Sequence, residues 1–328
     1  MFDRNLVTSG FDTETLVSER YLSFLLLAQI DAFPALELPI SGTNLKVRIH
    51  PPLRTQFERD EYIPNFPEAW EKEGSFEVKL LPGNTSGFCD IATNADGTRL
   101  FTRSLDSIVR IWDVAGRRQV TDEENPIRVD PAIGSAFNAA CTQIATASAD
   151  HNVRIWEFAA PSSPRVLSAH TNVVECVAFS PDGLLLASGS FDQTIKIWEL
   201  ATGNVLRTLT GHTGRVVSVA FNPAGDQLVS AGEDQSVRVW SVTSGVQTAK
   251  LTGHTEIVNC AVFSPNGLRV ASCSDDMSVR TWDPSQEKQV HEYRDSAAPG
   301  TVAHWVDFHI HNNRAHLVSG ASDGVVRV

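Results

Sequence analysis

A fixed interval between tryptophans is the feature that most constrains the fold of this chain. The tryptophans recur at intervals of 42 residues, with one interval of 44 at the start of the series, at Trp112, Trp156, Trp198, Trp240 and Trp282. Self-similarity at a fixed period near forty residues is the sequence mark of a repeat architecture. We therefore expect one structural unit to recur along residues 75–328.

The unit at residues 204–240 contains four short apolar-rich runs, NVLRTL, RVVSVAFN, QLVSAG and SVRVW. Turn-forming residues separate them, including Gly211-His212 and Pro223-Ala224-Gly225. Runs of about five residues with tight breaks predict that the four strands of one unit form one small antiparallel sheet. A single sheet of this size cannot bury itself, so neighbouring sheets must stack on it. Radial stacking into a propeller achieves this and leaves only short, protected edges.

Polar residues also recur at fixed offsets from the tryptophans. The aspartates that lie six residues before a Trp are Asp106, Asp150, Asp192, Asp234 and Asp276, and the residues four before these are Thr102, Thr146, Ser188, Ser230 and Ser272. A histidine lies 28 residues before three of the tryptophans, at His170, His212 and His254, whereas Asn84 and Arg128 take this position in the first two units. This set resembles the WD-repeat family, in which Asp, His, Ser/Thr and Trp form a hydrogen-bonded network inside each blade. The resemblance implies an all-β WD-repeat β-propeller.

Six repeats are visible, and their number leaves two ways to close the ring. The first unit opens with Phe76–Leu81, and the sixth runs from Lys288 to Val328, one residue short of its expected Trp. Strand 76–81 can supply the outer strand of the last blade and close a six-bladed ring. Alternatively, the chain is part of a larger protein with a seven-bladed ring, the commonest number that the family resemblance implies. The unpaired edge of an open propeller makes closure structurally important.

Residues 1–72 do not share the repeat and predict a small α+β N-terminal module ahead of the propeller at residues 73–328. A helix is expected at about residues 13–29, where Val17, Tyr21 and Phe24 begin one apolar stripe. A strand is expected at about residues 45–50, followed by a Pro-rich linker. This helix or strand could also serve assembly with another chain.

Composition excludes several classes of function. The net charge of −12 argues against nucleic acid as a partner, because phosphate binding needs a concentrated basic surface. No apolar run approaches the length of a membrane span. The five cysteines include no C-x-x-C pair, and Cys176 and Cys260 occupy equivalent repeat positions as small core residues. A reducing compartment, the cytoplasm, is therefore the expected location.

The sequence predicts no catalytic residue, cofactor or metal. It contains neither a phosphate-binding loop of the P-loop form nor a G-x-S-x-G nucleophile elbow. Asp307, His309 and His311, with His304 and His316 nearby, could suggest a metal site, but their alignment with the other units predicts a solvated histidine-rich turn at residues 309–313. One basic residue lies two positions before each Trp position, and its stem is expected to pack between blades with the charge directed to solvent or a carboxylate: Arg110, Arg154, Lys196, Arg238, Arg280 and Arg327.

Variation at one otherwise regular position points to a binding surface. The residue before the turn aspartate is Leu105, Ala149, Phe191, Glu233, Asp275 or Ser322. The family resemblance places this position on the rim that meets partners, with Arg215 near the same rim. Phe191 is a large apolar ring where solvent is expected, and such rings often anchor interfaces. We predict Phe191, Arg215, Glu233 and Asp275 as partner-binding residues.

The function expected from these observations is a non-catalytic scaffold that presents the propeller rims to protein partners, within a larger protein or complex. The alternative is a regulatory or sensor propeller attached to an enzymatic or assembly module at the N-terminus or beyond the end of the chain. Fold alone does not decide between them.

Overall fold

The computed structural model describes residues 88–93, 98–104, 106–113, 116, 118–120, 127–130, 132–159, 163–294, 300–311, 314–322 and 326–327. These residues form strands and turns grouped in six antiparallel sheets. The predicted helix at 13–29 and the predicted strands at 45–50 and 76–81 lie outside the described residues. The propeller-type stacking of small sheets predicted from the repeat is confirmed, whereas the two ways of closing the ring stay open.

Three consecutive sheets have the same construction, with four strands each in chain order. Sheet 3 contains β10 (Val174–Phe179), β11 (Leu185–Ser190), β12 (Thr194–Glu199) and β13 (Val205–Thr210). Sheet 4 contains β14 (Val216–Phe221), β15 (Gln227–Gly232), β16 (Ser236–Ser241) and β17 (Gln247–Thr252). Sheet 5 contains β18 (Val258–Phe263), β19 (Val270–Ser274), β20 (Val279–Asp283) and β21 (Lys288–Tyr293).

The other described sheets are variations on this pattern. Sheet 1 contains β1 (Phe88–Thr93), β2 (Arg99–Ser104), β3 (Ile108–Asp113), β4 (Arg118–Gln119) and β5 (Ile127–Arg128), and both short strands pair with β3. Sheet 2 contains β6 (Gly134–Phe137), β7 (Gln143–Ala147), β8 (Asn152–Glu157) and β9 (Arg165–Ser168). Sheet 6 contains β22 (Ala303–His311), β23 (Arg314–Ala321) and β24 (Val326–Arg327).

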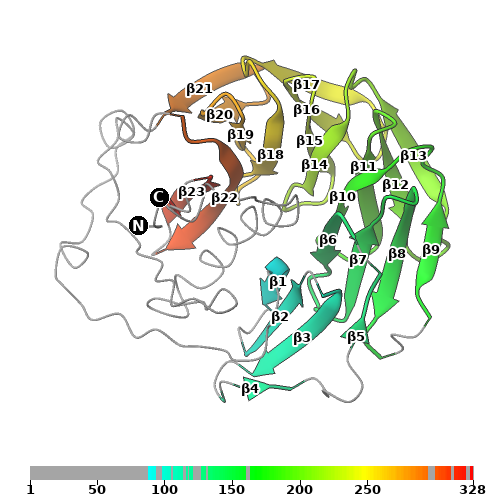
Figure 1. Ribbon diagram of the computed structural model, residues 1–328. Coiled ribbons are helices and arrows are strands. Elements are labelled where there is room, and N and C mark those ends of the chain that lie inside the picture. The colour runs from blue at the N-terminus through cyan, green and yellow to red at the C-terminus, as the bar shows by residue number, and fades with distance from the viewer. Residues whose placement is uncertain are drawn as a thin grey trace, which may run out of the picture.

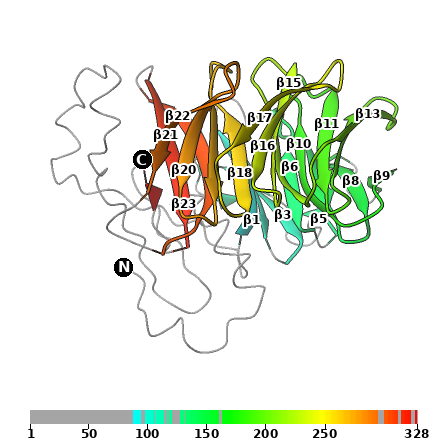
Figure 2. The same ribbon diagram turned by 90° about the horizontal axis from the view of Figure 1, so that it is seen from above.

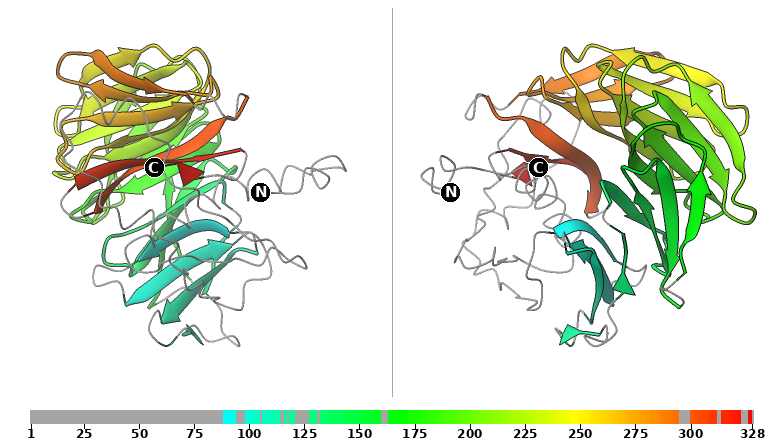
Figure 3. Two further views of the ribbon diagram at one scale, coloured as in Figure 1. Left: turned by 90° about the vertical axis from the view of Figure 1, so that its left-hand side faces the viewer. Right: turned by 45° about the vertical axis from the view of Figure 1, so that its right-hand side comes forward.

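The sheets follow one another around a common centre, with the first strand of each sheet innermost. Strands β6, β10, β14, β18 and β22 lie beside one another from sheet to sheet, while β9, β13, β17 and β21 form the outside of the arc (Figure 1). The view from above shows the sheets in succession (Figure 2), and two further directions show the same curved order (Figure 3). No described strand pairs sheet 6 with sheet 1.

The structure corrects the predicted assignment of strands to sheets. The run NVLRTL, which opens the unit at residues 204–240, forms β13 and pairs with β12 of the preceding sheet. Each sequence unit in this region therefore supplies the outer strand of one sheet and three strands of the next. In the second unit, whose first strand is degenerate, Ile127 and Arg128 still pair with β3 as a two-residue outer strand.

This offset gives each regular sheet two ends with different connections. At one end, the chain crosses from the outer strand of one sheet to the inner strand of the next, and the second strand turns into the third. We call this end the crossover face. At the opposite face lie the turns between the inner and second strands and between the third and outer strands.

The core lies between the sheets. In the interface of sheets 4 and 5, Val229, Val239 and Leu251 pack with Val258 and Trp282, all almost inaccessible to solvent. Burying a side chain of this size stabilises the fold by about 1.5–3 kcal/mol. Because two sheets share this apolar surface, neither sheet alone can exclude water from it. Such mutual dependence of neighbouring units is expected of a repeat protein.

The inner strands carry a bulge at the crossover face. The register shifts between Val174 and Cys176, between Val216 and Ser218, and between Val258 and Cys260, so one residue of each strand has no partner on the next strand. A bulge redirects the unpaired side chain and increases local twist. In β18 the unpaired residue is Asn259.

Sheet 6 confirms one prediction and corrects another. Arg327 of β24 lies opposite Ser319 of β23, as Arg280 lies opposite Ser272 in sheet 5, so the predicted register is right. The predicted turn at residues 309–313 is wrong in part, because β22 continues and pairs as far as His311 with Arg314. Neither proline nor glycine interrupts residues 303–311, so the strand does not end where its counterparts do.

Candidate functional site

The recurring polar residues form a continuous hydrogen-bonded network in sheets 3, 4 and 5. The Trp indole N–H donates to the Ser hydroxyl at 2.8 Å in each, from Trp198 to Ser188, Trp240 to Ser230, and Trp282 to Ser272. The histidine Nε2 lies 2.8, 2.8 and 2.7 Å from the same hydroxyls in His170, His212 and His254. Their Nδ1 atoms lie 2.8, 3.0 and 2.9 Å from Asp192, Asp234 and Asp276. The predicted network is confirmed in these three sheets.

The chemistry of the groups assigns their protons. The serine hydroxyl accepts from the indole, so its own hydrogen is available to donate to histidine Nε2. Histidine Nδ1–H then donates to the carboxylate, and a neutral imidazole satisfies every partner. Burial lowers the pKa of His170 and His254 below its ordinary value, despite the facing carboxylates, which favours this neutral form.

The aspartate also fixes the turn between the second and third strands. Asp192 accepts the backbone N–H groups of Thr171 and Thr194 at 3.0 and 2.9 Å and the Thr194 hydroxyl at 2.7 Å. Burial alone would raise the pKa of Asp192, but these bonds and the one from His170 outweigh it and hold the pKa at about 2. Asp276, where Ser278 replaces the threonine, is held at a pKa of about 2 for the same reasons.

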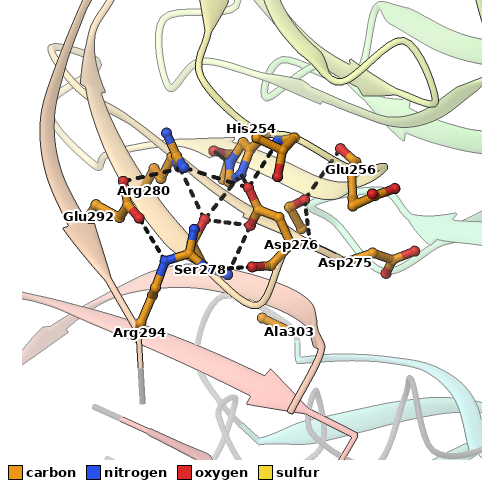
Figure 4. A network of polar contacts seen from close by, with 12 residues as sticks. His254, Glu256, Asp275, Asp276, Ser278, Arg280, Glu292, Arg294 and Ala303 are labelled. Carbon is orange, nitrogen blue, oxygen red and sulfur yellow. Dashed lines mark hydrogen bonds and ion pairs between the residues drawn. The ribbon is translucent and has the colours of Figure 1, made fainter. Parts of the chain in front are cut away.

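A buried arginine extends the network in sheets 4 and 5. Figure 4 shows Arg280 between Asp276 and Glu292, at 3.6 and 3.2 Å. Arg280 also donates to Gln289 at 2.6 Å. The glycine before the histidine suits a backbone φ of 155°, which residues with a Cβ rarely adopt, and a Cβ on Gly253 would also lie 2.7 Å from Arg280 Nη1.

Sheet 3 departs from this pattern at both residues. Here Ala169 precedes the histidine, and Lys196 replaces the arginine. The Lys196 amine donates to Thr208 at 3.3 Å. A lysine lacks the planar fork of a guanidinium, and the backbone also differs, because Ala169 does not have the positive φ of Gly211 and Gly253.

The basic residues predicted to reach solvent or a carboxylate reach carboxylates in sheets 1, 2, 4 and 5. Arg110 pairs with Asp106 at 2.7 Å, and Arg154 donates to Asp150 at 3.2 Å. Sheet 2 lacks the histidine, and Arg128 at that position is exposed on β5. Arg154 takes a second carboxylate instead, with its Nε 2.9 Å from Asp130.

The order Ser–His–Asp in these networks is that of a catalytic triad, but its environment differs from one. The hydroxyls of Ser188, Ser230 and Ser272 belong to residues with no accessible surface, and an indole N–H occupies each oxygen. A nucleophile must reach the substrate and must keep a lone pair for attack. The networks therefore stabilise the sheets and do not form acyl-transfer sites.

The structure brings three of the four predicted binding residues together on the crossover face. The Arg215 guanidinium lies over the Phe191 ring at 5.2 Å from its centroid, joining sheets 3 and 4. Arg215 Nε lies 3.9 Å from Glu233 and has no hydrogen-bond acceptor. Phe191 is half-buried by this stacking rather than fully exposed as predicted. The ion pair between Arg215 and Glu233, at 3.9 Å and with both side chains partly exposed to solvent, contributes little to the stability of the fold.

Asp275, the fourth predicted residue, lies on sheet 5 and has a partner that the sequence did not indicate. The Asn259 amide donates to the Asp275 carboxylate at 2.6 Å and to the Ala303 carbonyl at 3.1 Å. The Asn259 oxygen is buried and accepts no hydrogen bond. Figure 4 shows Glu256 and Asp275 directed away from the network on one side. Only the bulge register, visible in three dimensions, identifies Asn259.

The opposite face carries an apolar pocket of about 370 Å³. Its walls include Phe137, Phe179 and Phe221, which end the inner strands of sheets 2, 3 and 4. Exposed Leu184 and Leu268 lie on turns of the same face. Sequence comparison between units did not single out this pocket, because its phenylalanines recur regularly and resemble core residues.

The described residues show neither a metal cluster nor a membrane-spanning helix. Within the described part of the chain, no three His, Cys, Asp or Glu side chains come together as metal ligands. The search of the same residues for long apolar helices found none that could cross a bilayer.

Five stretches of the chain match the family model described as WD domain, G-beta repeat, at residues 75–113, 131–157, 162–199, 203–241 and 245–283. The chain belongs to the WD-repeat family. No curated protein matches this WD-repeat chain. Repeats of the family generally mediate protein–protein interactions, and WD-repeat proteins are typically non-catalytic.

Proposed function

We propose that this WD-repeat chain is a non-catalytic scaffold that binds a protein partner through the crossover face of sheets 3, 4 and 5, within a larger protein or complex. The observation that carries the proposal is the cluster of Phe191, Arg215 and Glu233. It combines an aromatic ring with a guanidinium whose Nε lacks an acceptor.

The geometry of this cluster suits an interface anchor. Stacking on the Phe191 ring orients the Arg215 guanidinium before any partner arrives, which reduces the side-chain entropy lost on binding. A partner that covers the cluster would remove solvent from an aromatic ring and could place a carboxylate beside the Arg215 guanidinium, whose side chain is 33% exposed. Aromatic and arginine side chains are the residue types that dominate binding energy in interfaces.

The proposal also includes a reducing compartment, such as the cytoplasm. Cys141 and Cys260 are buried as thiols, and burial raises the pKa of each to about 11. Such thiols act as small apolar core residues and have little thiolate character.

The test uses a partner captured from lysate, identified by mass spectrometry and then purified. Calorimetry should show that Phe191→Ala weakens binding by more than about fivefold, equivalent to about 1 kcal/mol. Arg215→Ala should weaken it similarly. The matched control is Leu184→Ala, which removes an apolar side chain that is 64% exposed on the opposite face.

The two faces give opposite outcomes. If Phe191→Ala and Arg215→Ala leave the affinity unchanged and Leu184→Ala lowers it, the partner binds the opposite face and the proposal is wrong. Far-UV circular dichroism identical to that of the unsubstituted chain must accompany each result, so that a loss of binding is not a loss of fold.

A further inference from the structure

We propose that Asp275 and Asn259 form a binding site for a cationic side chain, a lysine or arginine, of the protein partner. This inference rests on the proposed function, because it names the chemistry of the partner at one point of the crossover face. It starts from an acceptor that the fold leaves unused.

The orientation of the Asn259 amide is fixed by the two acceptors of its N–H groups. Its nitrogen donates both hydrogens, to the Asp275 carboxylate at 2.6 Å and to the Ala303 carbonyl at 3.1 Å. The flipped amide would place its oxygen against two other oxygens, which is unfavourable. The oxygen is therefore the amide atom left without a partner: it is buried and accepts no hydrogen bond, in a residue that is 7% exposed.

Asp275 presents a second unused acceptor at the same place. Its half-buried carboxylate accepts the Asn259 amide through Oδ1. Among the described residues, no basic side chain forms an ion pair with it. Asn259 and Asp275 thus each carry an oxygen with an unused lone pair, and a positively charged donor that entered between the two side chains would satisfy both.

The chemistry of the site favours an organic cation over a metal ion. Calcium takes six to eight oxygen ligands, whereas this position offers a carboxylate and one amide oxygen beside an N–H donor. A guanidinium or an ammonium group needs only a few acceptors and tolerates a neighbouring donor. The site therefore matches the side chain of arginine or lysine.

The charge of the surrounding face supports a basic partner. Outside the networks, the crossover face of sheets 3 to 5 carries the carboxylates of Glu233, Glu256 and Asp275, against the guanidinium groups of Arg215 and Arg294, of which Arg294 is paired with Glu292 at 2.7 Å. The whole chain has a net charge of −12. Complementary potential speeds the encounter with a positively charged segment and fixes its register.

A comparison of sheets 4 and 5 shows that sheet 4 has no counterpart of the Asn259–Asp275 pair. In sheet 4, Glu233 occupies the position of Asp275, but Val217 occupies the bulge position of Asn259. Sheet 4 thus has the carboxylate without the orphan amide oxygen. It provides a matched control within the same chain.

The experiment measures binding of capped pentapeptides to the full ¹⁵N-labelled chain by NMR. The peptides are glycine sequences with a central arginine, lysine or citrulline, the last being the neutral isostere of arginine. The reporter is the side-chain amide signal of Asn259, assigned by its absence from the Asn259→Val spectrum. We expect the arginine or lysine peptide to shift this signal and the citrulline peptide to leave it in place.

Substitutions then test the residues. Asp275→Asn should weaken binding of the responding peptide at least fivefold, whereas Glu233→Gln should change it less than twofold. Should Asp275→Asn fail to fold, judged by circular dichroism, Asn259→Val tests the same site through other signals of β18. An equal response to citrulline, or unchanged binding by Asp275→Asn, would overturn the proposal.

Two further arms separate the remaining outcomes. A shift of the Asn259 signal by calcium chloride, with displacement of the peptide, would replace the proposal with a metal site. If no peptide shifts the signal while Phe191→Ala still weakens the captured partner, the cation site fails and the proposed function stands.

Discussion

Replacing Asp234 by alanine tests the structural role of the network in sheet 4. The carboxylate is 5% exposed and accepts from His212 at 3.0 Å, from the Thr213 N–H at 3.1 Å and from Ser236 at 2.7 Å. It also lies 3.2 Å from the guanidinium of Arg238, whose side chain is 7% exposed. The substitution removes the acceptor of all these donors at once.

The expected loss follows from the groups left behind. Removing one member of a buried ion pair costs about 3–5 kcal/mol, and each stranded buried donor costs about 1–3 kcal/mol. Arg238 keeps its bond to Gln247 at 2.7 Å, so the lower end applies. We expect Asp234→Ala to lower the free energy of unfolding by about 3 kcal/mol.

Urea unfolding followed by circular dichroism measures this loss, with the Trp240 indole N–H signal as a local probe. The control is Glu233→Ala, which removes the adjacent, exposed carboxylate of the same turn and should change stability by less than about 0.5 kcal/mol. Equal unfolding curves for the two variants would refute the reasoning, because they would show that burial and hydrogen bonding of Asp234 do not matter.

Three further predictions concern stability. Gly253→Ala places a Cβ on a backbone with a φ of 155° and 2.7 Å from Arg280 Nη1, so urea unfolding should show a loss of about 2 kcal/mol; no loss contradicts this argument. Gln235 has a backbone φ of 63°, a left-handed conformation that strains a residue with a Cβ. Gln235→Gly removes this strain, so the thermal midpoint of unfolding should rise slightly, and a clear fall would contradict the reasoning. His170 and His254 stay neutral when folded but bind protons when unfolded, so stability should fall as pH drops below about 6.5; a flat profile from pH 7 to pH 5 contradicts the assigned direction.

The sequence predicted the network better than the sheets that contain it. Fixed offsets join His212, Ser230, Asp234 and Trp240, and the structure places all four in hydrogen-bonding distance. A period, however, does not say where a structural unit begins. The order outer, inner, second, third strand repeats just as the order inner to outer does, and the structure shows the first order, because β13 pairs with β12.

The candidate site was only partly predictable for a related reason. Phe191 stood out because its chemistry differs from that at equivalent positions, most of which carry small or acidic residues, and Asp275 was predicted because it occupies the same position on the rim. Asn259 did not, because a polar residue in a strand is unremarkable until the bulge and the two acceptors of its amide N–H groups are known. The stacking of Arg215 on Phe191 likewise joins two sheets, and sequence spacing within one unit carries no information on it.

Hydrogen–deuterium exchange of the complex with the captured partner tests the central claim, which is that the crossover face binds protein. We expect slower exchange on binding in the crossover segments 190–193, 211–217 and 256–259, and unchanged exchange in the opposite turns 180–184, 222–226 and 264–268. Protection confined to the opposite turns, with the crossover segments unchanged, would contradict the account.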